Sequence, residues 1–173
     1  MMQPIPWTFI RERTRLSWRD AAWGYHNACL GWSDVVQFAC DRLATGEDDA
    51  AIVELASLSK SDAHEAGKFL DKLALRLGDG DEASTKAKWL YLNLAWLFEN
   101  RLTCDDPLEA VEMIYADFDY PEEVAPFVRY MPVADGYDPG AHSAEANEAR
   151  LLAKWRNYLN TKARIFAPTP ERS

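Results

Sequence analysis

The apolar segment KAKWLYLNLAWLFEN, residues 86–100, places the strongest constraint on how this chain can fold. It runs for fifteen residues without glycine or proline, and its apolar side chains point in nearly every direction around a helix. A helix that is apolar all round must be buried by its neighbours, and a strand of this length would be unusual. The segment therefore predicts the central helix of a helical domain. Trp89 and Trp96 lie two helical turns apart within it, which indicates core packing rather than a platform for stacked bases.

Helix start signals recur along the rest of the chain. Ser17 with Asp20, and Asp106 with Glu109, have the spacing of capping boxes, in which a short side-chain oxygen and a carboxylate satisfy unpaired amides reciprocally. Pro107 follows Asp106 at the first helical position, where its missing amide costs nothing. Further starts are predicted at Ser33, at Asp48 or Asp49, at Ser61 and at Ser143, with stops at Gly31, Gly46 and Gly78.

These signals predict an all-α fold. We expect one helical domain over residues 1–166, built as a bundle or array of about seven to eight helices, and a disordered tail at residues 167–173. The segment Val128 to His142 contains two prolines and two glycines, so it is expected to form a long ordered loop anchored by Arg129, Tyr130 and Met131.

The sequence also predicts the cellular compartment of the protein. The apolar run from Trp89 to Phe98 falls well short of the roughly 20 residues that span a bilayer, and the first residues lack the pattern of a secretory signal. Three cysteines, Cys29, Cys40 and Cys104, lack CxxC spacing and are expected to be buried free thiols. A cytoplasmic protein without a membrane partner is therefore expected.

The net charge of −9 is concentrated in the middle of the chain. Residues 45–82 carry a net charge of −6 and residues 83–138 one of −7, whereas the two ends are mildly basic. Such a field repels nucleic acid and attracts basic macromolecules. A nucleic-acid partner is disfavoured, and a basic protein partner is favoured.

The acids gather most densely in YADFDYPEEV, Tyr115 to Val124, which contains no basic residue to neutralise them. A helix starting at Asp106 would bury Leu108 and Val111 and turn its acids away from that stripe. The predicted partner-binding residues form an acidic ridge with aromatic anchors and the start of the following loop: Asp105, Glu109, Glu112, Tyr115, Asp117, Asp119, Tyr120, Glu122, Glu123, Arg129 and Tyr130. Carboxylates around aromatic side chains suit a lysine- or arginine-rich partner. The competing interpretation is a capped helix end whose carboxylates only face water.

Catalytic and metal-binding patterns are sparse. His26, His64 and His142 lack the spacing of a helical zinc site, and neither a GxSxG elbow nor a phosphate-binding glycine loop occurs. No catalytic residue, cofactor or metal site is predicted. A carboxylate enzyme using Asp117 and Glu123, with or without a divalent ion, and a structural subunit of a larger assembly remain as alternatives.

Three stretches resemble a bacterial family known only as a domain of unknown function. They are WRDAAWGY at residues 18–25, the KWLYLNLAWLFEN helix and DPLEAVEMIYADFDYPEEVAPFVRYMP at residues 106–132. The resemblance covers most of the chain and carries no catalytic residues with it. Small acidic helical proteins of this kind also resemble immunity proteins, which neutralise a toxin domain. That likeness implies a stoichiometric inhibitor whose partner is a basic toxin domain.

Overall fold

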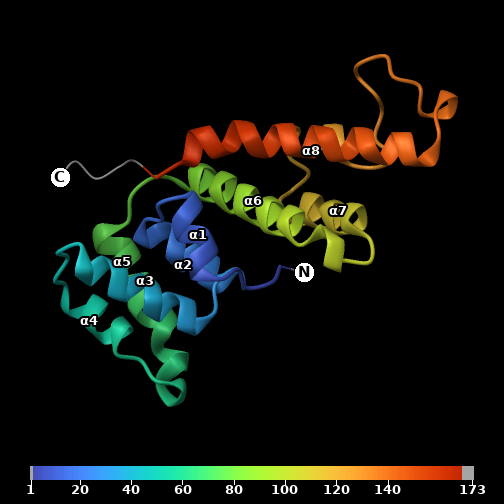
Figure 1. The fold of residues 1–173 in the computed structure, drawn as a ribbon. Helices are drawn as coiled ribbons and strands as arrows, with labels where there is room; N and C mark the ends of the chain where they lie inside the picture. Colours follow the sequence, from blue (N-terminus) through green and yellow to red (C-terminus); the bar gives the residue numbers. More distant parts are fainter. Residues whose placement is uncertain (1, 169–173) are drawn as a thin grey trace. The chain divides into compact units, whose positions relative to one another are not determined.

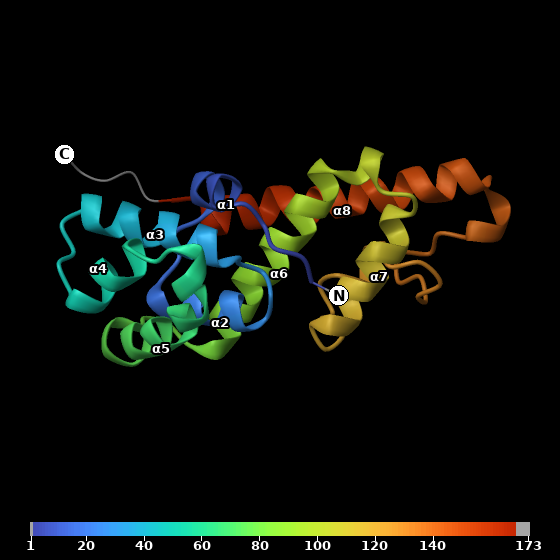
Figure 2. The same cartoon turned by 90° about the horizontal axis from the view of Figure 1, so that it is seen from below.

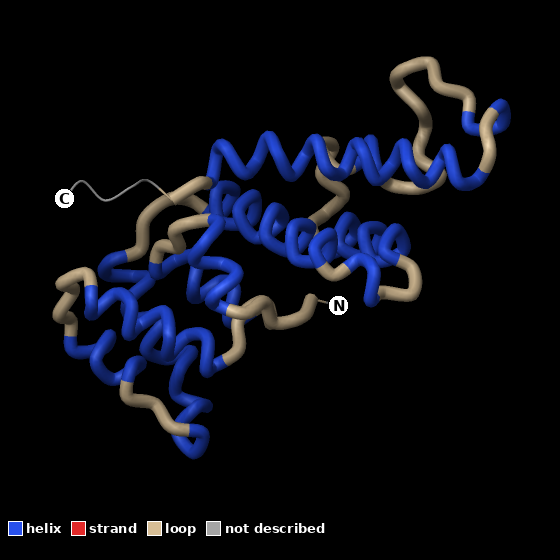
Figure 3. The backbone as a smooth tube through the Cα atoms, viewed as in Figure 1, coloured by secondary structure: helices blue, strands red, loops and turns tan. Residues whose placement is uncertain are grey.

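The computed structural model describes residues 2–168, and within them every regular element is a helix (Figure 1, Figure 3). This confirms the all-α prediction. Short 3-10 helices lie between the α-helices at Lys60–Glu65, Arg101–Thr103, Ala125–Phe127 and Pro139–Ala141. The eight α-helices of the described residues are α1 (Trp7–Arg13), α2 (Trp18–His26), α3 (Trp32–Ala44), α4 (Ala50–Ala56), α5 (Ala66–Leu77), α6 (Glu82–Glu99), α7 (Pro107–Asp117) and α8 (Ala144–Phe166).

The described chain forms two compact units. The N-terminal unit comprises residues 2–89 with Ala167 and Pro168, and the C-terminal unit comprises residues 90–166. The division falls inside α6, whose first turns belong to one unit and whose later turns belong to the other. The expectation of one domain over residues 1–166 stays a prediction. Of the expected tail, Ala167 and Pro168 follow the end of α8 without regular structure, and residues 169–173 lie outside the described part.

In the N-terminal unit, α2 packs on α5, α4 packs on both α3 and α5, and α1 packs on α3 (Figure 2). Phe38 of α3 lies between two tryptophans, 5.0 Å from the ring of Trp7 and 4.7 Å from that of Trp18. The first half of α6 contributes Trp89, which is fully buried and donates from its indole nitrogen to the carbonyl oxygen of Asp20 at 2.8 Å. A β-carbon at Gly24 would lie 2.2 Å from that indole ring, so only glycine allows this approach.

Asp20 joins helix capping to tertiary structure in the same unit. Its carboxylate accepts from the Ser17 backbone amide at 2.9 Å, while the Ser17 hydroxyl accepts from the Asp20 amide at 3.1 Å. The predicted capping box of α2 is therefore confirmed. The same carboxylate, only 4% exposed, also accepts from Thr85 at 2.7 Å and forms an ion pair with Lys88 of α6. One side chain thus closes the start of α2 and holds α6 against it.

The C-terminal unit is built around aromatic side chains. Trp155 of α8 is fully buried, with its ring edge-on to Phe98 at 4.9 Å and stacked on Phe127 at 6.3 Å. These contacts hold α8 along the second half of α6 (Figure 1). Tyr158 lies one turn further on, and burial raises the pKa of its hydroxyl. No helix of residues 2–168 has both the length and the apolar composition needed to cross a bilayer.

Several local predictions are confirmed. At the start of α7, Asp106 accepts from the amide of Glu109 at 3.1 Å, and Pro107 takes the first helical position. At the start of α8, Ser143 accepts from the amide of Ala146 at 3.1 Å, and Asp49 caps α4. Leu108 and Val111 form the buried stripe of α7, as expected.

Other local predictions were wrong. Helix α1 was not predicted, because Pro6 stands at its start and makes no side-chain cap. Helix α3 begins after Gly31 rather than at Ser33, because Asp34 reaches back to the Gly31 amide at 3.2 Å. The expected start at Ser61 is instead the 3-10 helix Lys60–Glu65, after which α5 begins. The cysteines are free thiols, but only Cys29 is buried, whereas Cys40 is exposed.

Two helices end on non-glycine residues in the left-handed conformation. At the end of α2, Ala28 has φ 60°, and the Cys29 amide donates back to the Gly24 carbonyl at 2.7 Å. At the end of α7, Asp119 has φ 62°, and the Tyr120 amide donates to the Tyr115 carbonyl at 2.8 Å. Both are Schellman motifs, in which glycine is the usual left-handed residue. Gly31, predicted to stop α2, is not used for that purpose.

Asp20→Ala is expected to lower the free energy of unfolding by about 3 kcal/mol, because it leaves the half-buried ammonium group of Lys88 without a counterion and removes the cap of α2. Urea unfolding followed by far-UV circular dichroism measures the effect. The double variant Asp20→Asn/Lys88→Met removes the charge on both sides and should recover part of the loss. If the double variant is no more stable than Asp20→Ala, the ion pair is not the cause.

Ala28→Gly is expected to raise the free energy of unfolding by about 1 kcal/mol, because glycine adopts the left-handed conformation without the steric penalty that alanine bears. Ala153→Gly is the matched control, since Ala153 is exposed within α8 and should lose about 1 kcal/mol. Equal losses in both variants would contradict the role given to the left-handed position.

Candidate functional site

The predicted acidic ridge lies in the C-terminal unit, on α7 and the turn that follows it. Of its seven carboxylates, Asp105, Glu109, Asp117, Asp119, Glu122 and Glu123 are exposed, and Glu112 is half-buried. The buried side of α7 faces the aromatic core through Leu108 and Val111, so the acids are left on the outer surface.

Two of the seven acids are neutralised by residues far away in the sequence. Arg129 donates from Nε to Glu112 at 2.7 Å and from Nη1 to Asp106 at 3.0 Å. Lys162 of α8 lies 2.7 Å from the carboxylate of Glu123. The sequence interpretation treated all seven charges as uncompensated, which is wrong for Glu112 and Glu123.

The Arg129 contacts also shift pKa values. The hydrogen bond to Glu112 raises the pKa of the Arg129 guanidinium further above its usual value. The backbone amide of Glu109 and then the guanidinium of Arg129 hold the pKa of Asp106 below its usual value. Arg129 and Asp106 are therefore both charged throughout the physiological range.

Four of the other acids, Asp105, Glu109, Asp119 and Glu122, make no ion pair within residues 2–168. They carry the outward negative charge of the ridge. Asp119 is held in its left-handed conformation by the cap at the end of α7, which places its carboxylate just beyond the last turn.

The aromatic side chains of the predicted site have different surroundings. Tyr115 and Tyr120 meet edge to face at 5.2 Å, which is the apolar contact that accompanies a Schellman motif. Tyr120 nevertheless leaves 64% of its surface exposed, and Tyr130 leaves 94%. Tyr130 has φ 65° and lies beside the guanidinium of Arg129, which is 5.8 Å from its ring centre. Both tyrosines are thus available for contact with another molecule.

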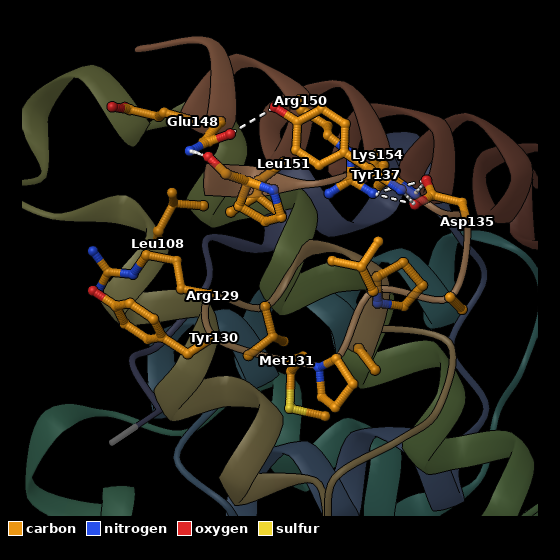
Figure 4. Close-up of a pocket in the computed structure, with 18 of the residues that line it drawn as sticks. Leu108, Arg129, Tyr130, Met131, Asp135, Tyr137, Glu148, Arg150, Leu151 and Lys154 are labelled. Atoms are coloured by element: carbon orange, nitrogen blue, oxygen red, sulfur yellow. Dashed lines mark hydrogen bonds and ion pairs between the residues drawn. The ribbon is translucent and has the colours of Figure 1, made fainter. Parts of the chain in front are cut away.

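The loop after Tyr130 is fastened to α8 by one carboxylate. Asp135 accepts from Arg150 at 2.7 and 2.8 Å and from Lys154 at 2.9 Å, as Figure 4 shows. These two cations, Lys154 first, hold the pKa of Asp135 far below its usual value. Tyr137 adds a hydrogen bond of 2.6 Å to Asn147, and the Arg150 guanidinium lies 4.0 Å from the ring centre of Tyr137. The ordered loop is therefore anchored by Arg129, as predicted, and by Asp135 and Tyr137. The prediction was wrong for Tyr130 and Met131, which are exposed.

A groove lies between this loop, α7 and α8, with a volume of about 710 Å³. It brings together Glu122, Arg129 and Tyr130 of the predicted site with residues that sequence reasoning missed, among them Glu148 and Leu151 of α8 (Figure 4). The remaining predicted residues do not line it. Only the proline- and glycine-rich composition of residues 128–142 hinted at a structured loop there.

A metal centre has no support in the described part of the chain. Within residues 2–168, no three histidine, cysteine, aspartate or glutamate side chains gather in an arrangement that could hold an ion. Asp117 and Glu123, the pair considered for acid and base catalysis, are both exposed, and Glu123 is bound to Lys162.

Comparison with known proteins gives one match. A protein-family model described as "Uncharacterized protein conserved in bacteria (DUF2247)" matches residues 7–163. No curated protein and no solved structure matches the chain.

Asp135→Asn is expected to release the loop from α8, because an amide cannot form ion pairs with Arg150 and Lys154. Hydrogen exchange of residues 130–138 should become about fivefold faster, with little change in far-UV circular dichroism. In the unsubstituted protein the stability that this attachment contributes is fully present above about pH 4, the pKa of an unfolded aspartate, and is lost as the pH falls through the lowered pKa of folded Asp135.

Asp138→Asn is the matched control, because the Asp138 side chain accepts from the Gly140 amide at 2.9 Å and asparagine can keep that bond. Equal exchange rates in the two variants would mean that Asp135 does not anchor the loop.

Proposed function

The chain belongs to the bacterial DUF2247 family, and from that premise we propose that it is a cytoplasmic immunity protein. It binds a basic toxin domain through the acidic ridge and neutralises it stoichiometrically. The proposal rests on one observation above the others: four exposed carboxylates of the ridge have no ion-pair partner within residues 2–168, while two exposed tyrosines lie beside them.

The charge distribution favours fast association with a basic surface. Exposed acids of one sign, gathered on α7 and on the segments before and after it, raise the local potential and steer a cationic partner, which increases association rates by roughly 10 to 1,000-fold at low ionic strength. A toxin that acts on nucleic acid or another anionic substrate needs a basic cleft. Such a cleft is complementary to the ridge formed by Asp105, Glu109, Asp119 and Glu122.

The tyrosines supply the short-range part of binding. Tyr120 and Tyr130 bring large, semi-rigid rings with a hydroxyl at the outer end, the kind of side chain that forms energetic hot spots in protein interfaces. Tyr120 is held by its contact with Tyr115, so little conformational entropy is lost when a partner buries its ring. Tyr130 is almost fully exposed and follows Arg129, whose ion pairs fix the backbone beside it.

The carboxylate enzyme and the structural subunit are the other candidates. Neither has a specific observation in its favour, since Glu123 is already paired with Lys162 and the described acids do not converge on an ion.

The double variant Glu109→Gln/Asp119→Asn tests the proposal against the product of the neighbouring gene, the expected toxin. The unsubstituted protein should form a complex at micromolar concentration and restore growth to cells that express the toxin. Because the variant removes two steering charges, its association rate at low salt should fall about tenfold, and the difference should shrink as salt is added.

Asp48→Asn/Glu54→Gln is the matched control, because both residues are exposed in the N-terminal unit and the change in net charge is the same. Its association rate should stay within about twofold of the unsubstituted protein. Failure to form any complex would overturn the immunity proposal, and equal effects of the two double variants would overturn the assignment to the ridge.

A further inference from the structure

The groove beside the ridge is a built site rather than an irregularity of the surface. Its volume of about 710 Å³ lies within the range of roughly 300–1,000 Å³ typical of ligand pockets. Its two sides come from different parts of the chain, the loop from Val128 to Tyr137 and the first three turns of α8 (Figure 4). The loop is tied to α7 through Arg129 and to α8 through Asp135, so the groove is formed before anything binds.

The surfaces of the groove are largely apolar. Leu108 of α7 and Val128 are buried at its base, and Leu151 of α8 is half-buried beside them. Along the loop, Met131 leaves 37% and Val133 leaves 36% of their surfaces exposed. Binding is therefore favoured when an apolar group of a ligand replaces the water that covers these side chains.

The three cations and three carboxylates that line the groove cancel, and Asp106 and Glu112, which pair with Arg129 from outside it, add two further negative charges. Arg129, Arg150 and Lys154 all line it, and each is already paired with a carboxylate of Asp106, Glu112 or Asp135. Glu122 and Glu148 also line it, both are exposed, and neither has an ion-pair partner within residues 2–168. The groove therefore offers negative charge next to apolar surface.

We propose that this groove receives an extended segment of the partner protein that carries an apolar side chain beside a lysine or arginine. The apolar side chain lies against Leu151, Met131 and Val133. The basic group lies near Glu122 or Glu148. Near Glu122 and Glu148 an acidic segment would meet like charge. The cations Arg150 and Lys154 share the single carboxylate of Asp135 and hold the loop there.

This inference rests on the proposed function only in assigning the segment to a partner protein. Glu122 belongs both to the ridge and to the groove, so a partner that covers the ridge can place one of its segments in the groove without leaving that surface. The ridge then attracts the basic partner, and the groove selects among basic partners by the sequence of one segment.

The first test needs no partner. The tripeptide acetyl-Leu-Lys-Leu-amide is titrated to millimolar concentration into the protein, and the methyl signals of Met131, Val133 and Leu151 are followed by NMR. Saturable shifts of these signals are expected, and acetyl-Leu-Glu-Leu-amide should give none. Glu122→Gln/Glu148→Gln should weaken the lysine peptide about fivefold. Equal binding of the two peptides, or no binding of either, would overturn the inference.

A second variant tests the apolar contacts in the complex with the neighbouring gene product. Met131→Ala/Val133→Ala should increase the dissociation rate of the complex at least about fivefold. Val53→Ala/Leu75→Ala changes two exposed apolar residues of the N-terminal unit and should leave that rate unchanged.

The two proposals fail in different ways. If the peptide binds in the groove but the gene product forms no complex, the immunity function is wrong and the specificity of the groove stands. A different outcome is that the complex forms and depends on Glu109 and Asp119, while substitutions at Met131 and Val133 have no effect and the peptide does not bind. In that case the groove inference is wrong and the immunity function stands.

Discussion

The surface of the C-terminal unit depends on the double ion pair that Arg129 makes with α7. The guanidinium bridges Asp106, which caps the first turn of the helix, and Glu112, which lies near its middle. Its single positive charge is shared between two carboxylates, so it offsets one negative charge beside the ridge and fixes the start of the loop against the helix. Because its side chain is only 27% exposed, this contact is less screened by solvent than an ordinary surface pair.

The Arg129 ion pairs separate two surfaces that differ in their physical character. On one side of them lie the exposed acids and Tyr120, where long-range attraction dominates. On the other side lies the groove, where apolar contact and shape decide what fits. Attraction between charges acts over about a Debye length and discriminates little between cationic partners, whereas burial of apolar side chains acts only on contact. The proposed recognition of one basic partner among many would use both.

The helix caps explain why several residues of the ridge hold their positions. The Schellman motif at the end of α7 requires Asp119 in the left-handed conformation and brings Tyr120 onto Tyr115. Part of what resembled a set of aromatic anchors in the sequence is therefore the ordinary apolar contact of a helix end. The exposed face of Tyr120 remains a candidate for partner contact, and Tyr130, outside the motif, is the more exposed of the two.

The sequence by itself determined the helical class and most of the helix boundaries. The reason is that caps are local: Ser17 and Asp20, or Asp106 and Pro107, satisfy backbone groups within one turn of themselves. Where the local signal was absent or ambiguous, as at Pro6 and Gly31, the prediction failed. Only the tertiary structure decided which carboxylates of the ridge remain unpaired, because Glu112 finds Arg129, and Glu123 finds Lys162, across long stretches of chain. The groove was equally hidden from the sequence, since its two sides meet only after α8 packs on the aromatic core, and no local pattern encodes that approach.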